Sequence, residues 1–192
     1  MSKRQPEIIK FQNEALLMTE YFDKVDHNDH VIGKISREQA HKLNLPHRAV
    51  HIFIEDQNGK WLLQKRSAKK DLDPLLLTSS CSGHVDASET YLDAAVRECE
   101  EELGLRISSK DLTEILRCSP CRETGMEFVR VYLIEKISEK ITPSPHEIDE
   151  IVYLKLEELV RKSETEKAKF SGSFLHIFSL IKAKLSNYSR ES

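Results

Sequence analysis

The sequence predicts an α+β protein in which a mixed β-sheet is sandwiched between helices. Strand-like segments fill much of the chain between residues 20 and 80, and an acidic segment with helical periodicity follows them. Further strand-like segments come next, and an apolar segment with helical spacing lies near the end of the chain. Strands, a helix, more strands and a terminal helix are typical of a layered sheet with helices packed on it.

Composition limits the classes of function that the chain can have. Charged residues make up 32% and hydrophobic residues 39% of its 192 residues, and the net charge is only −3. This balance argues against a protein that binds nucleic acid by bulk electrostatics. No apolar run approaches the ~20 residues of a membrane span, and the N-terminal sequence has no uninterrupted apolar stretch typical of a secretory signal. We therefore expect a cytoplasmic protein with no membrane or nucleic-acid partner.

The first half of the chain predicts two pairs of strands and a short helix. Residues 20–36 read as two short strands around a polar turn at residues 27–29, and the helix begins at Ser36. Two further strands follow, joined by a turn whose Asn58-Gly59 pair is a strong hairpin signal. These strands are expected over residues 49–55 and 61–66, before a polar loop over residues 67–74.

The second half predicts more strands and two helices. Strands are expected over residues 112–117, 127–137 and 150–154, with a proline-bearing loop over residues 141–146 and a helix over residues 156–162. The segment 174–185 is apolar at helical spacing, which indicates a helix that packs on the sheet. A helix that binds a partner or a membrane surface is the alternative. Residues 47–185 are expected to form the main domain, with residues 1–46 packed on it and residues 186–192 as a tail.

The acidic helix has clear start and stop signals. Thr90 and Asp93 have the spacing of a capping box, and Gly104 stands where a left-handed C-terminal cap is expected. One apolar stripe is expected between them, formed by Leu92, Ala95, Val96, Cys99 and Leu103.

Three carboxylates fall on a separate arc of this helix. Glu98, Glu101 and Glu102 lie at positions i, i+3 and i+4, where like charges repel each other and destabilise a helix. A divalent cation that prefers oxygen ligands removes this repulsion, which predicts Mg²⁺ or Mn²⁺. The alternative is a solvated acidic helix face.

The helix belongs to a longer motif, GHVDASETYLDAAVRECEEELGL, that resembles the Nudix box at every fixed position. Gly83 is followed after five residues by Glu89, after seven more by Arg97-Glu98, and then by Glu101-Glu102 and Gly104. Fixed residues at roughly 5–10% usage each make a chance match rarer than about one in a hundred thousand. Residues 21–67 look like the upstream part of the isopentenyl-diphosphate-isomerase-like branch of Nudix proteins. The two stretches cover about two-thirds of the chain, and the resemblance implies the Nudix fold.

The resemblance implies a hydrolase that splits a diphosphate linkage in a nucleoside diphosphate derivative by attack of water on phosphorus. By position, Glu98 and Glu102 are the expected main metal ligands, and Glu101 is a ligand or the catalytic base. The backbone carbonyl of Gly83 is a further candidate ligand. Glu127 could supply a remote catalytic base, and an ordinary exposed strand glutamate is the alternative.

The resemblance also implies supporting residues and a substrate, but not the substrate's identity. Arg97 is expected to pair with Glu89 and to orient the loop against the helix. Basic side chains that could meet phosphate are Lys65, Arg66, Lys69, Lys70 and Arg130. A small-molecule diphosphate is the expected partner, and the resemblance is compatible with a homodimer.

An isomerase is the second hypothesis from the same resemblance. His47, His84 and Glu127 stand where the isomerase branch binds metal, so the two histidines are a candidate second metal site. The catalytic cysteine of that branch should precede the box glycine, where this chain has Ser82. Cys81 is one residue early and is expected to point away from the site. The serine at this position and the complete box favour hydrolysis over isomerisation. A non-catalytic binding module is a third hypothesis, which the full set of box carboxylates disfavours.

The remaining histidines and cysteines are not assigned to the site. His41 and His51 carry a weaker signal than His47 and His84. Cys99 is expected in the core. Cys118 and Cys121 form a lone CxxC without a second ligand pair nearby in the sequence, so two ordinary thiols are expected, and a redox pair is the alternative.

Overall fold

A computed structural model of the protein describes residues 20–191, and its elements follow the predicted order. The strands of this part of the chain are β1 (Tyr21–Val25), β2 (Val31–Ser36), β3 (His47–Asp56), β4 (Lys60–Arg66), β5 (Leu77–Thr78), β6 (Cys81–His84), β7 (Thr113–Cys118), β8 (Glu127–Ile137) and β9 (Ile148–Lys155). The helices are α1 (Arg37–Lys42), α2 (Tyr91–Leu103), α3 (Leu156–Thr165) and α4 (Gly172–Glu191), with short 3-10 helices η1 (Ser109–Asp111) and η2 (Lys167–Lys169).

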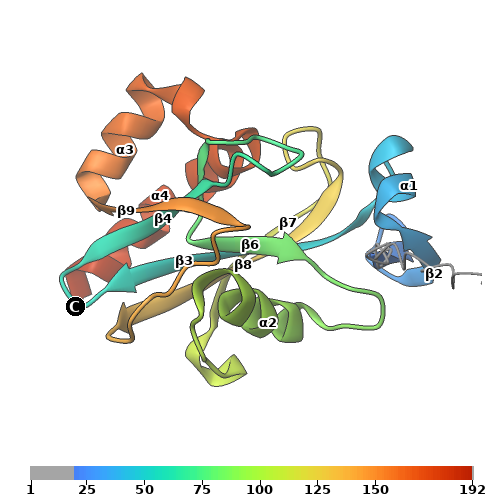
Figure 1. The fold of residues 1–192 in the computed structure, drawn as a ribbon, viewed down its shortest axis with the longest axis horizontal. Coiled ribbons are helices and arrows are strands. Elements are labelled where there is room, and N and C mark those ends of the chain that lie inside the picture. Colours follow the sequence, from blue (N-terminus) through green and yellow to red (C-terminus); the bar gives the residue numbers. More distant parts are fainter. Residues whose placement is uncertain (1–19, 192) are drawn as a thin grey trace, which may run out of the picture.

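A seven-stranded mixed sheet forms the centre of the molecule (Figure 1). Its strand order is β5-β4-β3-β8-β7, while β6 pairs with β3 and β9 pairs with β4. β3 and β8 run parallel, whereas β4 and β6 both pair antiparallel with β3. β4 and β6 pair with different halves of β3. β6, which carries the box glycine Gly83, therefore lies in the middle of the sheet.

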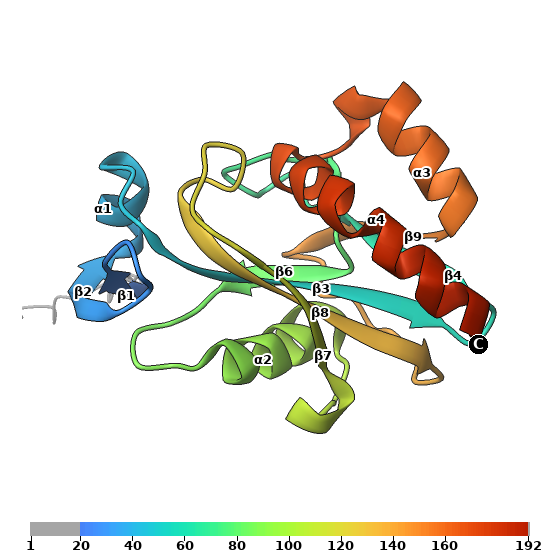
Figure 2. The same ribbon diagram turned by 180° about the vertical axis from the view of Figure 1, so that it is seen from behind.

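Helices cover both faces of this sheet (Figure 2). Side chains alternate along β3, so that Val50 and Ile52 are buried in the core cluster under α2, whereas Ala49 and Phe53 are buried in the cluster under α4. Both clusters consist of buried apolar residues. The predicted sheet between helices is therefore confirmed.

β1, β2 and α1 form a small unit beside one end of the sheet (Figures 1 and 2). Phe22 of this hairpin is fully buried. Arg48 of β3 donates from Nε to the Asp29 carboxylate at 2.6 Å, and the Tyr91 hydroxyl of α2 donates to the same carboxylate at 2.9 Å. These polar contacts hold the hairpin against the main domain.

The helix of the box begins and ends at the predicted residues. Thr90 Oγ1 accepts a hydrogen bond from the Asp93 backbone amide, and Gly104 adopts a left-handed conformation with a φ of 63°. Leu92 was wrongly expected on the apolar stripe: it is 39% exposed, and Ala94 is buried instead. Side chains of a first helical turn tilt toward the N-terminus, so Leu92 points past the sheet toward solvent.

The C-terminal helix is longer than the sequence predicts. α4 packs on the sheet as predicted, but it continues to Glu191 through residues expected to be a tail, because no glycine or proline interrupts the segment. The expectations for residues 1–19 lie outside the described residues. In the described part of the chain, no helix is long and apolar enough to cross a membrane.

Candidate active site

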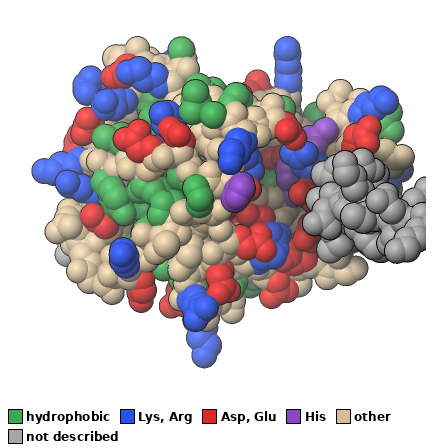
Figure 3. Space-filling view, in the orientation of Figure 1, with side chains coloured by type: hydrophobic (Ala, Val, Ile, Leu, Met, Phe, Trp, Pro, Cys, Tyr) green, Lys and Arg blue, Asp and Glu red, His purple; other side chains and the backbone are tan. Residues whose placement is uncertain are grey.

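Most of the predicted site residues line one cavity of about 960 Å³. Its walls come from α1, β3, β6 and α2, from the loops after β4 and before β9, from the segment before β8 and from the start of α4. Acidic, basic and histidine side chains gather around a hollow on this face of the molecule (Figure 3). The polar lining fits a charged ligand better than an apolar one.

Glu98 faces the backbone of β6 at the box glycine. A Cβ atom added to Gly83 would lie 2.0 Å from Cδ and from Oε1 of Glu98, so only glycine leaves room for this carboxylate. Burial, and next the negative charge of Glu102, raise the pKa of Glu98 to about 8, although Arg97 acts in the opposite direction. The carboxylate therefore occupies a place where additional positive charge would stabilise it.

Glu102 is the most deeply buried carboxylate of the box. Its side chain is 3% exposed, and Oε2 accepts hydrogen bonds from Gln64 Nε2 at 2.9 Å and from the Ser82 backbone amide at 3.1 Å. Burial raises the pKa of Glu102, although hydrogen bonds with the Cys81 thiol and the Ser82 amide act in the opposite direction. Two fixed donors hold the side chain in one orientation between β4 and β6.

Arg97 connects the loop before α2 to the acidic face of the helix. It donates to both carboxylate oxygens of Glu89 at 2.9 Å, so the predicted ion pair is present and bidentate. It also donates to the His84 carbonyl at 3.0 Å, to Glu98 at 2.7 Å and to Glu101 at 3.1 Å. Glu101 lines the cavity but its side chain is 60% exposed, unlike those of Glu98 and Glu102.

The donor set of this wall fits a hard divalent cation. Glu98, Glu101 and Glu102 all line the cavity, as does Gly83. Arg97 pairs with Glu98 and Glu101, and Glu102 adds a third carboxylate, which leaves net negative charge among the oxygen donors. Oxygen ligands with net negative charge are the environment that Mg²⁺ and Mn²⁺ prefer.

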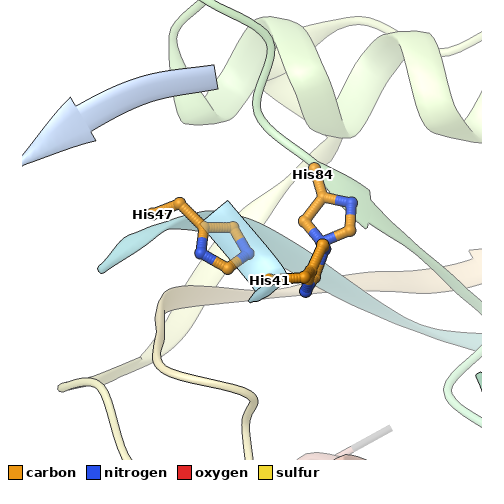
Figure 4. Close-up of side chains that lie close together, drawn as sticks. All are labelled: His41, His47 and His84. Atoms are coloured by element: carbon orange, nitrogen blue, oxygen red, sulfur yellow. The ribbon is translucent and has the colours of Figure 1, made fainter. Parts of the chain in front are cut away.

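Three histidines converge beside another part of the same cavity, which His41 and His84 line (Figure 4). Ring nitrogens of His41 on α1, His47 on β3 and His84 on β6 lie within 4.8 Å of one another. His47 Nδ1 is 2.9 Å from the Leu45 carbonyl, which turns Nε2 toward the cluster. Phe22 stacks on the rings of His47 and His84 at centroid distances of 5.3 and 4.6 Å and fixes their planes.

Glu127 belongs to this cluster and is not an ordinary exposed strand glutamate. Its Oε1 lies 3.1 Å from His84 Nε2 and 3.6 Å from His47 Nε2, and its side chain is 14% exposed. Burial acts to raise its pKa, but the two histidines together hold the pKa of this carboxyl well below its usual range.

The histidine cluster has the features of a metal site. Among residues 20–191, the buried Nε2 atoms of His41 and His47 have no hydrogen-bond partner. Burial and the neighbouring histidines lower the pKa of His41 to about 4, which leaves its ring neutral and free to donate a lone pair. Imidazole nitrogens with one carboxylate suit Zn²⁺, Mn²⁺ or Fe²⁺.

His41 is the site residue that sequence reasoning missed. The helix α1 is only six residues long, and its connection to β3 folds His41 back onto His47. The short spacing between His41 and His47 is the only sequence feature that could have indicated their contact. It indicates a contact only when the chain is known to fold back between them. His51, the other unassigned histidine, is buried and lies 2.8 Å from Ser79 Oγ through Nδ1.

The cysteine expected to point away from the site does not line the cavity, but its thiol contacts the Glu102 carboxylate behind the cavity wall. Cys81 is fully buried in the core under α2, and burial raises the pKa of its thiol well above the usual value. Ser82, its neighbour on β6, lines the cavity. The alternation of side chains along a strand separates the two residues.

The basic residues divide into two groups. Arg66, Lys69 and Lys70 line the cavity, whereas Lys65 and Arg130 do not. Arg130 was expected near phosphate, but it pairs with Glu114 at 3.1 Å and lies over the ring of Tyr91. It follows Glu127 by three residues on β8 and therefore faces the other side of the sheet.

Comparisons with known proteins agree with this geometry. The NUDIX domain family matches residues 45–176. An uncharacterised Nudix hydrolase of Yersinia pestis is 43% identical over 94 residues, which are 49% of this chain and 51% of that protein, so the chain spans about half the length of such relatives. An isopentenyl-diphosphate Delta-isomerase of Serratia proteamaculans is 31% identical over 162 residues, 83% of this chain and 90% of that protein.

Solved structures show the same architecture. The crystal structure of DR0079 from Deinococcus radiodurans has a TM-score of 0.71 and 28% sequence identity to this chain, over 82% of this chain and 96% of that protein. The family match covers more than half of the chain, and the box and the fold agree with it. The chain therefore belongs to the NUDIX domain family.

Proposed function

We propose that the protein is a divalent-metal-dependent hydrolase that cleaves a diphosphate linkage, in a nucleoside diphosphate derivative or a related pyrophosphate, by attack of water on phosphorus. The observation that carries this proposal is a pair of carboxylates, the buried Glu102 and the largely covered Glu98, in a cavity that Arg66, Lys69 and Lys70 also line. An anionic diphosphate is repelled by the acidic helix. A cation held by the carboxylates and basic side chains that contact phosphate both offset this repulsion.

The residues of the box have separate roles in this proposal. Glu98, Glu102 and the Gly83 carbonyl would hold Mg²⁺ or Mn²⁺, which when bound neutralises the diphosphate and lowers the pKa of the attacking water. Glu101 completes the ligand set or accepts the proton of the water. Arg97 keeps Glu98 and the loop at Glu89 in place through its five hydrogen bonds.

The reaction is a substitution at phosphorus. The water oxygen forms a bond to phosphorus while the bridging P–O bond breaks and the leaving phosphate takes the electron pair. The proton of the water passes to Glu101 or Glu127. Glu127 is the weaker candidate for the base, because its contacts with His47 and His84 favour its charged form and so lower its affinity for a proton.

Isomerisation of isopentenyl diphosphate is the second candidate function. The relation to the Serratia isomerase over most of both chains favours it, and so does the cluster of His41, His47, His84 and Glu127. Proton transfer at carbon in that branch uses a cysteine, and here the side chain in the cavity is Ser82 while the Cys81 thiol is buried. A serine hydroxyl is too weak an acid to replace the thiol.

The test is phosphate release across a panel of diphosphates with Mg²⁺ or Mn²⁺. The panel contains ADP-ribose, NADH, dinucleoside polyphosphates, nucleoside triphosphates and isopentenyl diphosphate, and the last sample is also analysed for its allylic isomer. We expect metal-dependent hydrolysis that falls at least about a hundredfold in Glu102→Gln. Glu101→Gln should also lose most of the activity. If this variant kept more than about a tenth of the wild-type rate, Glu101 would have no role in the mechanism.

The control is Glu100→Gln, on the same helix. Glu100 is exposed and pairs with Arg106, so its loss should leave hydrolysis within about twofold of wild type. Double-bond migration without hydrolysis would reject the proposed function and select the isomerase. Ser82→Cys separates the two further, because only an isomerase should gain activity from a thiol in the cavity.

A further inference from the structure

A third group of metal-ligating side chains lies at the rim of the cavity, apart from the box carboxylates and from the histidine cluster. It consists of Cys121 and Glu123, in the loop between β7 and β8, and His176 on α4. The thiol sulfur, a carboxylate oxygen and a ring nitrogen all lie within 4.8 Å of one another, and Cys121 Sγ is 3.7 Å from His176 Nε2. Neither the box nor the isomerase-like stretch includes these residues.

The loop that carries Cys121 is held in one conformation by Thr124. This threonine is 2% exposed, and its hydroxyl accepts from the Cys121 backbone amide at 3.3 Å. The hydroxyl also lies 3.3 Å from the carbonyls of Cys121 and Glu127 and 3.4 Å from the Cys121 sulfur. Cys121 is therefore positioned before any ligand binds, while Glu123 remains exposed and able to approach it.

The donor set indicates the class of ion. One thiolate, one imidazole and one carboxylate combine a soft ligand with harder ones, which suits zinc and disfavours Mg²⁺ or Ca²⁺. Cys118, the other cysteine of the CxxC, is 9% exposed and packs in the core under α4, outside the cluster. The CxxC pair is thus divided, and the partners of Cys121 come from another part of the chain.

We propose that Cys121, Glu123 and His176 bind a zinc ion that ties the β7–β8 loop to α4. Three protein ligands leave a fourth tetrahedral position for water or for a ligand of the cavity. Arg122 in this loop and Ser173 at the start of α4 both line the cavity. The ion would therefore fix one wall of the cavity without being the ion that the box carboxylates hold.

The test is a titration of the metal-free full-length protein with Co²⁺, which replaces zinc and reports its ligands by absorption. Binding to a thiolate produces a sulfur-to-cobalt charge-transfer band in the near ultraviolet, which neither the carboxylates nor the histidine cluster can produce. We expect this band in the wild type and its displacement by Zn²⁺. Cys121→Ser should lose the band, and His176→Ala should weaken Co²⁺ binding at least about tenfold.

Two matched variants serve as controls, and the assay needs no substrate. Cys118→Ser should keep the band, because Cys118 is not in the cluster, and His41→Asn should keep it because the histidine cluster contributes no sulfur. Circular dichroism checks that each variant is folded. Absence of the band in the wild type, or its survival in Cys121→Ser, would overturn the proposal, whatever the panel of diphosphates shows.

Discussion

At the scale of single residues, the site depends on one glycine that leaves space for a carboxylate. Gly83→Ala would place a methyl group 2.0 Å from the Glu98 carboxylate, which must then move away from β6. We predict that this substitution lowers metal-dependent hydrolysis at least about tenfold, since a displaced ligand weakens metal binding. Steady-state kinetics at several Mn²⁺ concentrations measure the effect.

The control for this prediction is Gly33→Ala. A Cβ atom at Gly33 meets no atom within 4 Å, and the residue also lies in a strand. Its substitution should leave activity unchanged within about twofold. Equal losses in the two variants would show that the effect comes from strand glycines in general and not from Glu98.

The buried Glu98 carboxyl also predicts how stability depends on pH. Its pKa is about 8 in the folded protein against 4.5 for the free side chain. A group with a raised folded-state pKa contributes stability that is fully present below about pH 4.5 and is lost as the pH rises toward 8. The metal-free protein should therefore melt about 3 °C or more lower at about pH 8 than at about pH 6.5.

The carboxylates dominate this pH window. The pKa of His41 and that of His51 are lowered from 6.5 to about 4, so most of the stability gained as these two histidines lose their proton is already present at pH 6.5. The small remainder raises stability with pH and so opposes the effect of Glu98. Mn²⁺ should recover the loss at the higher pH, and Glu98→Gln should flatten the dependence. A melting temperature that rises with pH in the metal-free wild type would contradict the prediction.

At the scale of elements, Arg97 makes the loop and the helix of the box act as one unit. Its guanidinium joins Glu89, the His84 carbonyl and the acidic face of α2, and a lysine cannot form these contacts at the same time. We predict that Arg97→Lys lowers kcat at least about tenfold while the protein stays folded. Kinetics and thermal melting of the same preparation separate the two effects.

Arg106→Lys is the matched control. Arg106 follows α2, its side chain is 87% exposed and it pairs with Glu100. An exposed pair of this kind contributes little, so this variant should resemble wild type in kcat and in melting temperature. If Arg97→Lys behaved in the same way, the proposed role of the arginine network would be rejected.

The hairpin β1–β2 and α1 are elements outside the box that complete the cavity. They bring Phe22 and His41 against His47 and His84, and the contacts of Asp29 with Arg48 and Tyr91 hold them there. The first part of the isomerase-like stretch, residues 21–42, thus forms a structural unit that supplies one wall of the site.

At the scale of the whole molecule, α4 seals the sheet face opposite α2. Phe174 is fully buried and stacks between Phe170 and Phe178 at centroid distances of 5.2 and 5.3 Å. Loss of such a side chain costs about 3–5 kcal/mol, which predicts a melting temperature at least about 6 °C lower for Phe174→Ala. Calorimetry of the metal-free protein measures this change in melting temperature.

The same helix offers the control. Leu180 is 49% exposed, so Leu180→Ala should change stability by less than about 0.5 kcal/mol. A comparable loss in both variants would mean that the loss does not depend on burial of the side chain, and the sealing of the core would not explain the effect of Phe174→Ala.

Much of the fold and of the box was predictable because it depends on neighbouring residues. The caps at Thr90 and Gly104, the Asn58-Gly59 hairpin and the pairing of Arg97 with Glu89 all arise within a few turns of chain. The common arc of the box carboxylates follows from helical periodicity alone. The first-turn residue Leu92 shows the limit, because periodicity does not say where the sheet beneath a helix ends.

The tertiary structure decided what comes together across the sheet. The parallel register of β3 with β8 places Glu127 beside His47, and it turns Arg130 to the other face. The fold-back of α1 adds His41, and the docking of α4 brings His176 to Cys121. These contacts join residues far apart in sequence through strand order and register, and a single sequence specifies neither until the whole core has packed.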